Sequence, residues 1–82
     1  MKICGRECLE CGDTIYSRAR HDFRRCTCEA VAVDGGFNYC KVSAKPGSRS
    51  KPVEVDVDAT VMQLFNDWAL RIDKFGVIRA GV

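Results

Sequence analysis

Residues 8–13 read CLECGD, and residues 24–30 read RRCTCEA. The first stretch holds a Cys-x-x-Cys pair, Cys8 and Cys11, followed at once by Gly12, and the second holds a closer Cys-x-Cys pair, Cys26 and Cys28. A tight turn can point two sulfurs at one ion, and a glycine after the pair tolerates that turn while its N–H stays free to reach a thiolate. The intervening residues 12–25 are long enough for a strand, a loop and a strand to return to the same place. The spacing predicts one metal site.

Zinc is the metal that this pattern favours, because structural Zn²⁺ takes four tetrahedral ligands and is often held by four thiolates. A thioredoxin-type pair sits at the start of a helix, and no helical periodicity surrounds CLECGDTIY. A disulfide framework would need an oxidising compartment. Iron is an alternative, although two glycine-backed Cys-x-x-Cys pairs are its more usual carrier. We therefore expect one structural Zn²⁺ on Cys8, Cys11, Cys26 and Cys28.

Three further residues could ligate a metal. His21 lies between the two pairs and is a possible alternate ligand if one of the two closely spaced thiols fails to reach the ion. Its simpler interpretation is a histidine that hydrogen-bonds the backbone or Asp22 in the connecting turn. Cys4 and Cys40 are expected outside the site, since a free cysteine commonly behaves as a small buried apolar residue.

The size of the chain limits what it can be. With 82 residues, 46% of them hydrophobic, and no run near the ~20 apolar residues that a bilayer demands, one small domain without a membrane span is expected. MKICGRECLECGD contains no apolar stretch of signal-peptide length, so we expect cytoplasmic localisation and reduced thiols. The formal charge is +2, and zinc bound by four thiolates would bring the net charge near zero.

Short strands separated by turns are predicted in the first half. Thr14–Tyr16 and the segment around Phe23 can form two arms, and EAVAV, DGG and FNYCKV in succession are typical of a β-hairpin. Residues 43–52 hold both prolines and three basic residues without apolar periodicity, which predicts a linker or loop.

The C-terminal part changes period. Val53, Val55 and Val57 alternate with acidic residues, as in a strand with one wet face. Helical spacing then predicts a helix over residues 59–75, with Thr60 and Gln63 as a capping box and Gly76 as its end. Its apolar stripe, expected to face the core, comprises Val61, Leu64, Phe65, Trp68, Ile72 and Phe75.

These elements predict a small α+β fold with zinc-ribbon-like β-hairpins at the N-terminus, followed by a C-terminal strand and one amphipathic helix. We expect residues 1–82 to form a single domain, with a zinc-ribbon-like β part over 1–42, the linker or loop over 43–52, and the strand plus helix over 53–82.

The order CxxCGD, HDF, CxC and VDGG resembles a family of small uncharacterised zinc-ribbon-like proteins of phages and bacteria, over about residues 8–41. The resemblance implies that the four cysteines of the two pairs are the metal ligands. It also implies that the turns are shaped by His21, Asp22, Asp34, Gly35 and Gly36. The chain departs from the pattern at Glu29, where a glycine would be expected after the second pair. The resemblance implies zinc and a phage-like context, and it carries no activity.

No set of residues typical of an active site accompanies the thiols. A catalytic zinc keeps an open position for water, and four thiolates close the coordination sphere. The chain has one histidine, no nucleophile-and-base pair and no glycine-rich phosphate loop. We therefore expect a protein that is not an enzyme.

Charged residues indicate where a partner could bind. SRARHDFRRC places four arginines around Phe23, which suits phosphate contact and stacking, but arginines can equally offset thiolate charge or face water. An acidic row follows the linker, and Leu70 points away from the apolar stripe. The candidate partner-binding residues are Arg18, Arg20, Arg24, Arg25, Glu54, Asp56, Asp58 and Leu70.

We expect the partner to be a host protein or protein complex, such as a CRISPR effector or another defence system, with the chain as its inhibitor or adaptor. A zinc-ribbon nucleic-acid-binding module or transcriptional regulator is the second hypothesis. The sequence does not indicate the oligomeric state.

Overall fold

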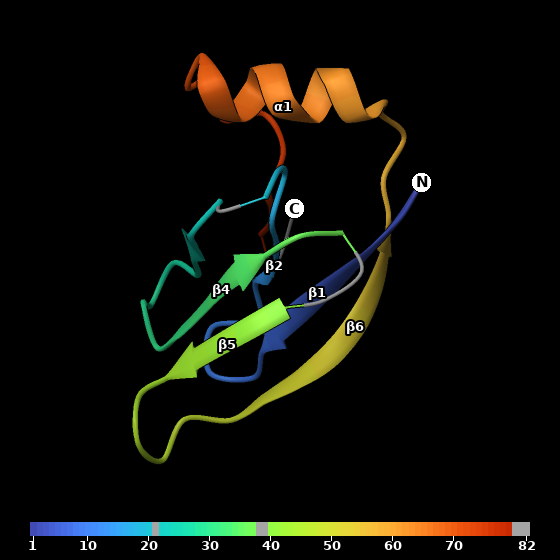
Figure 1. The fold of residues 1–82 in the computed structure, drawn as a ribbon. Helices are drawn as coiled ribbons and strands as arrows, with labels where there is room; N and C mark the ends of the chain where they lie inside the picture. The colour runs from blue at the N-terminus through green and yellow to red at the C-terminus, as the bar shows by residue number, and fades with distance from the viewer. Residues whose placement is uncertain (21, 38–39, 80–82) are drawn as a thin grey trace.

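The computed structural model describes residues 1–20, 22–37 and 40–79, which form two antiparallel sheets and one helix, so the predicted α+β class is confirmed (Figure 1). One sheet has the strand order β6-β1-β2-β7 and the other has the order β3-β4-β5. The elements are β1 Lys2–Cys8, β2 Thr14–Tyr16, β3 Arg24–Arg25, β4 Val31–Gly35, β5 Cys40–Ala44, β6 Ser50–Asp56, α1 Val61–Ala69 and β7 Val77–Ile78.

Strand β1 is central to the first sheet and was not predicted. It pairs with β6 along its whole length, from Lys2 opposite Asp56 to Cys8 opposite Ser50, and with β2 on its other side. A Cβ at Gly5 would lie 2.8 Å from the Ile15 carbonyl oxygen and 2.9 Å from a Val55 methyl carbon, so the sheet closes around this glycine. The strand is not recognisable from the sequence, because the glycine and the charged residues after it interrupt the apolar alternation.

The expected linker over residues 43–52 is largely β-structure, which corrects that boundary. Residues 43–44 end β5 and residues 50–52 begin β6, leaving residues 45–49 as the connection. The early start of β6 is stabilised by β1, since Lys51 Nζ lies 3.3 Å from Glu7 Oε1 and Arg6 Nε donates to Ser50 Oγ at 2.9 Å. Polar residues join this strand because β1 supplies a hydrogen-bonding edge.

The predicted hairpin of residues 29–42 is present as β4 and β5, paired from Val31 opposite Ala44 to Gly35 opposite Cys40. Asp34 and Gly35, expected in its turn, instead belong to β4. The two expected arms do not pair with each other, because β2 lies in the first sheet and β3 pairs with β4 in the second. Figure 1 shows β4 and β5 crossing in front of β1 as a second layer. In this arrangement Cys26 and Cys28, which follow β3, lie close to Cys8 at the end of β1.

Two hydrophobic clusters form the core. One lies beneath α1 and contains Ile3, Tyr16, Val55, Val57 and Leu64. The other lies among β1, β2 and β4 and contains Cys8, Ile15, Cys26, Val31 and Val33. Two cysteines of the predicted metal site are therefore part of the second cluster.

Helix α1 is shorter than the predicted 59–75. It begins as expected after Thr60, whose side chain accepts the N–H of Gln63 at 3.1 Å while Gln63 Oε1 accepts the N–H of Thr60 at 2.7 Å. It ends at Ala69 rather than at Gly76. The chain turns back because Asp67 accepts the backbone N–H groups of Lys74 at 2.8 Å and Phe75 at 3.0 Å.

The helix is also rotated away from the predicted orientation. Its buried residues are Leu64 and Asp67, whereas Val61, Phe65 and Ile72 of the expected core stripe are 55%, 46% and 60% exposed. Trp68 is half-buried and meets Phe65 edge-on, with ring centroids 5.7 Å apart. The cause is a buried ion pair that draws Asp67 inward, with 2.8 Å between Arg18 Nη1 and Asp67 Oδ2. Only one edge of the apolar stripe faces the core.

Arg18 holds several segments together. Its Nε lies 2.8 Å from Asp22 Oδ2, and its Nη1 reaches Asp67 and, at 3.0 Å, Asp73 Oδ1. Burial alone would lower the pKa of Arg18, but its hydrogen bonds to Asp22 and Asp67 raise that pKa above its ordinary value. Burial likewise favours the neutral form of Asp67, yet Arg18 and the N–H groups of residues 75 and 74 lower its pKa. Both groups are therefore charged inside the protein.

Among the described residues, no helix has the length and apolarity needed to traverse a bilayer.

Candidate metal centre

The first cysteine turn starts where β1 ends. Cys8 is its last residue, and the chain then bends so that the N–H of Gly12 donates to the Cys8 carbonyl at 2.8 Å. Gly12 has φ +83°, a left-handed conformation that glycine adopts without steric cost. The N–H of Cys8 donates to the Asp13 carbonyl, also at 2.8 Å, and closes the turn. The predicted tolerance of the turn by this glycine is confirmed, but its N–H is bound to a carbonyl and is not free to reach a thiolate.

The second cysteine turn lies between β3 and β4. The N–H of Glu29 donates to the Cys26 carbonyl at 2.9 Å, and the N–H of Cys26 donates to the Val31 carbonyl at 3.1 Å. Glu29 has φ +61°, so it takes the left-handed conformation expected of a glycine at this position. The backbone at Glu29 is therefore of the kind that a glycine adopts freely, and a non-glycine residue there costs roughly 1 kcal/mol.

The four thiols of the two turns converge. The Sγ atoms of Cys8, Cys11, Cys26 and Cys28 all lie within 4.8 Å of one another. Cys28 Sγ is 3.7 Å from that of Cys8 and 3.5 Å from that of Cys26. Zn–S bonds of about 2.3 Å in a tetrahedron place the sulfurs about 3.8 Å apart, so the cluster has the size of a zinc–thiolate site. Cys8 and Cys26 are buried, and Cys28 is exposed.

The thiols affect one another's ionisation. Burial raises the pKa of Cys11, but backbone N–H groups of Cys28 and Asp13 and the neighbouring thiols bring it down to about 7. Burial raises the pKa of Cys8. The N–H of Ala30 lowers the pKa of Cys28, whereas desolvation and the other three thiols together raise it to about 12. Without a cation the cluster loses its protons one after another, because each thiolate opposes the next. A bound divalent cation stabilises all four thiolates together.

Asp13 joins the two cysteine turns, and sequence reasoning did not assign it this role. Its Oδ2 accepts the backbone N–H of Thr27 at 2.8 Å as well as the Thr27 hydroxyl. Thr27 lies between the second pair of cysteines, and Asp13 follows the first pair. Arg79 Nη1 also donates to the Thr27 hydroxyl and lies 3.9 Å from Asp13 Oδ2. The Asp in CGD was the available clue, since carboxylates commonly orient metal-binding turns.

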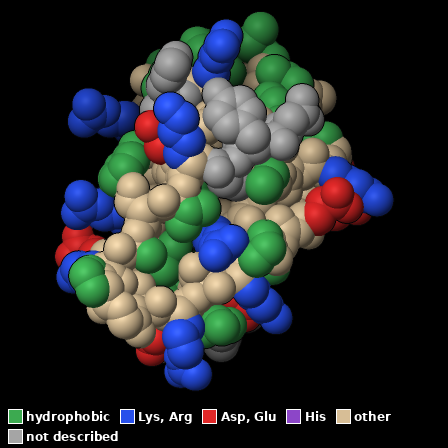
Figure 2. Space-filling view, turned by 60° about the horizontal axis from the view of Figure 1, so that its bottom comes forward, with side chains coloured by type: hydrophobic (Ala, Val, Ile, Leu, Met, Phe, Trp, Pro, Cys, Tyr) green, Lys and Arg blue, Asp and Glu red, His purple; other side chains and the backbone are tan. Residues whose placement is uncertain are grey.

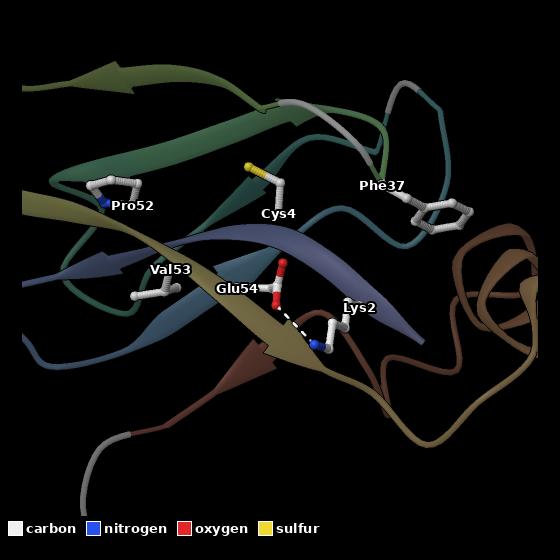
Figure 3. Close-up of a pocket in the computed structure, with 6 residues that line it drawn as sticks. All are labelled: Lys2, Cys4, Phe37, Pro52, Val53 and Glu54. Atoms are coloured by element: carbon white, nitrogen blue, oxygen red, sulfur yellow. Dashed lines mark ion pairs between the residues drawn. The ribbon is translucent and has the colours of Figure 1, made fainter.

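The remaining candidate ligands are only partly described. His21 lies outside the described residues, and so does the side chain of Cys40. Cys4 is half-buried on β1 and lies outside the cluster of four thiols. It lines a hollow of about 460 Å³ with Phe37 and Val53, beside an ion pair of 3.5 Å between Lys2 Nζ and Glu54 Oε1 (Figure 3).

The four arginines of SRARHDFRRC do not form one surface. Arg18 is 3% exposed and bound by carboxylates, which corrects its assignment as a partner-binding residue. Arg24 is largely buried, with its Nη1 3.6 Å from Asp73. Arg20 is exposed, and Arg25 lies 5.3 Å from the centre of the Phe23 ring. On the face drawn in Figure 2, Lys and Arg side chains are scattered, most of them near the edge, rather than gathered in one patch.

The acidic row and Leu70 are at the surface, as their assignment requires. Glu54, Asp56 and Asp58 are exposed, and Asp56 lies 3.7 Å from the N-terminal amino group. Leu70 is 68% exposed at the end of α1.

Residues 1–44 match the family described as Domain of unknown function (DUF7695), and the chain belongs to this family. The matched segment contains both cysteine turns and ends with β5. Neither the curated proteins nor the solved structures gave a match to the chain.

Proposed function

We propose that this chain is a non-catalytic, zinc-bound binding protein that inhibits or adapts a host protein complex. The fold supports a rigid scaffold, because the two cysteine turns tie the sheets together through buried sulfurs. The sequence resemblance to phage proteins supports a phage-encoded protein that acts in the host cytoplasm, with a defence complex such as a CRISPR effector as its target. The exposed side of α1 is the single observation that carries the binding role.

The four thiolate ligands suit zinc better than they suit other metals. Thiolate ligands favour zinc or iron, and a closed tetrahedral set of four thiolates is typical of structural zinc. Such a site leaves no coordination position for substrate or water. The metal in this proposal therefore stabilises the fold and takes no part in a reaction.

The side of α1 that faces away from the sheets carries a mostly apolar strip, the outer helix face. It consists of Val61, Met62, Phe65 and Ala69, with the half-buried Trp68 at its margin, and the exposed Asn66 lies beside it. Met62 is 66% exposed, and Figure 1 shows no other element over this side of the helix. Apolar side chains gathered on one surface commonly mark a protein interaction site. Anchors on one side of a helix suit a partner with an apolar groove that accepts a helix.

A paired variant tests the outer helix face. We expect the tagged, zinc-loaded chain to capture one partner from host lysate, and Met62→Ser with Phe65→Ser to weaken that binding roughly thirtyfold or more, since truncating a central anchor costs about 2 kcal/mol or more. The matched control is Val42→Ser, which changes an apolar residue of similar exposure on β5. Zinc content and the unfolding midpoint are measured for each variant.

Capture that survives the double variant, or that is lost equally with Val42→Ser, would show that the partner does not use the outer helix face. Once the partner is known, its activity with and without the chain distinguishes an inhibitor from an adaptor.

A nucleic-acid-binding module is the second candidate, favoured by Arg25 stacked on Phe23, a ring that is 50% exposed. Arg18 is buried among carboxylates and Arg24 is largely buried, so a nucleic-acid strand can reach only the two exposed arginines of this stretch, Arg20 and Arg25. Arg25 also lies 3.6 Å from the exposed Glu29. Binding through Arg20 and Arg25 would give a log–log salt slope of about −1.4 for a single strand or −1.8 for a duplex, and Arg25→Ala would halve it. We expect instead that the purified protein binds nucleic acid no more tightly than about 10⁻⁴ M at physiological salt. Fluorescence anisotropy with labelled oligonucleotides over a salt series distinguishes the salt-dependent complex from this weak binding.

A further inference from the structure

A hollow of about 570 Å³ lies between β3, the turn after α1 and β7. Three cations line it, Arg24, Lys74 and Arg79, together with one carboxylate, Asp73. Its volume falls within the roughly 300–1,000 Å³ of small-molecule sites. The hollow is separate from the outer helix face and from the four thiols, whose residues do not line it.

The positive charge of this hollow is only partly offset. Three cations against one carboxylate leave a net charge of +2 on its lining. Asp73 is shared, because it lies 3.0 Å from Arg18 and 3.6 Å from Arg24. Arg79 lies 3.9 Å from Asp13, which is outside the lining, and its side chain is 60% exposed. The lining therefore favours an anion.

Arg24 is held in place at the side of the hollow. Its side chain is 20% exposed, and its buried Nε has no hydrogen-bond partner among the described residues. A Cβ at Gly76 would lie 2.8 Å from this Nε and 3.2 Å from Cζ, so the backbone of Gly76, at φ +102°, packs directly against the guanidinium. The position of the cation is set before any ligand arrives, which reduces the entropy lost on binding.

We propose that this hollow binds a phosphate monoester. A phosphate monoester carries about −1.5 to −2 charges at neutral pH, which matches the lining, whereas one carboxylate carries half as much. The planar guanidinium of an arginine suits two phosphate oxygens at once. Phe75 and Ile78 add an apolar wall against which the organic part of the ligand can pack. This proposal does not depend on the protein partner of the outer helix face.

Inorganic phosphate is the first probe, added to the zinc-loaded full chain at constant ionic strength and followed by ¹H–¹⁵N NMR. We expect saturable shifts of residues 73–79 and of the Arg24 Nε–H. Arg79→Gln and Lys74→Gln should each weaken binding about tenfold, the factor that corresponds to 1.4 kcal/mol. The matched control is Arg49→Gln, because Arg49 pairs with Glu10 on the surface and does not line the hollow. Phe65→Ser should leave phosphate binding unchanged.

Shifts that do not saturate, or that Arg79→Gln and Lys74→Gln leave unaltered, would overturn the proposal. Adenosine monophosphate and adenosine distinguish the contribution of the phosphate from that of the organic part, and a requirement for the phosphate supports the site. A short oligonucleotide with and without a 5′-phosphate tests whether the monoester can come from a nucleic-acid end. Equal binding of both oligonucleotides at the hollow would contradict a monoester site, since internal phosphodiesters would then suffice.

Discussion

Replacing Cys8 or Cys26 with serine is expected to abolish metal binding and unfold the segment that contains both cysteine turns. Both side chains are buried in the cluster with Ile15, Val31 and Val33. Structural zinc contributes roughly 10–16 kcal/mol in small peptides, which is as large as the whole stability of an ordinary domain at roughly 5–15 kcal/mol. Loss of the ion should therefore remove most of the folding free energy. Metal analysis together with ¹H–¹⁵N NMR measures both effects.

The matched control is Cys4→Ala, which removes a half-buried thiol that lies on β1, as Cys8 does, but outside the cluster of four thiols. It should retain the metal and a folded spectrum. Full zinc content in Cys8→Ser or Cys26→Ser would mean that the ligands are wrongly assigned. Zinc loss with an intact fold would instead mean that the hydrophobic clusters suffice without the ion.

The second large effect is expected for Arg18→Met, which should destabilise the protein by about 3–5 kcal/mol, since it leaves buried carboxylates without their cation. The carboxyl groups of Asp22 and Asp67 are each no more than 3% exposed and lie 2.8 Å from the guanidinium. The turn after α1 depends on the same pair, because Asp67 also binds the backbone of residues 74 and 75. Chemical unfolding of the zinc-loaded protein measures the change.

Arg25→Met is the control, because it removes an exposed arginine of the same stretch and should change stability by no more than about 0.5 kcal/mol. If the two variants have equal stability, the buried network does not hold the helix. Loss of the ordered turn in Arg18→Met, seen as shifts of residues 70–76, would separate this network from a general effect of lost charge.

The convergence of the four thiols was predictable from local spacing. Each cysteine pair forms a short turn, and the residues that shape it, such as Gly12, lie next to the thiols in sequence. The hairpin of β4 and β5 and the capping box of Thr60 are local in the same sense. Patterns of this kind are legible because the interacting groups are a few residues apart.

Features that depend on distant contacts were missed. Strand β1 is stabilised by pairing with β6, about fifty residues away, and its own sequence lacks alternation. The orientation of α1 was wrong because periodicity shows which residues are apolar but not which partner turns the helix. Arg18 and Asp67, forty-nine positions apart, decide that orientation through one buried pair. The same rotation leaves Phe65 exposed, which moves it from the expected core to the outer helix face.

X-ray absorption at the zinc edge of the protein purified without added metal tests the central claim most directly. We predict one zinc per chain with four sulfur neighbours at about 2.3 Å, supplied by Cys8, Cys11, Cys26 and Cys28. A nitrogen neighbour at about 2.0–2.1 Å would show that a histidine replaces a thiolate, and the absence of stoichiometric zinc would contradict the metal centre altogether.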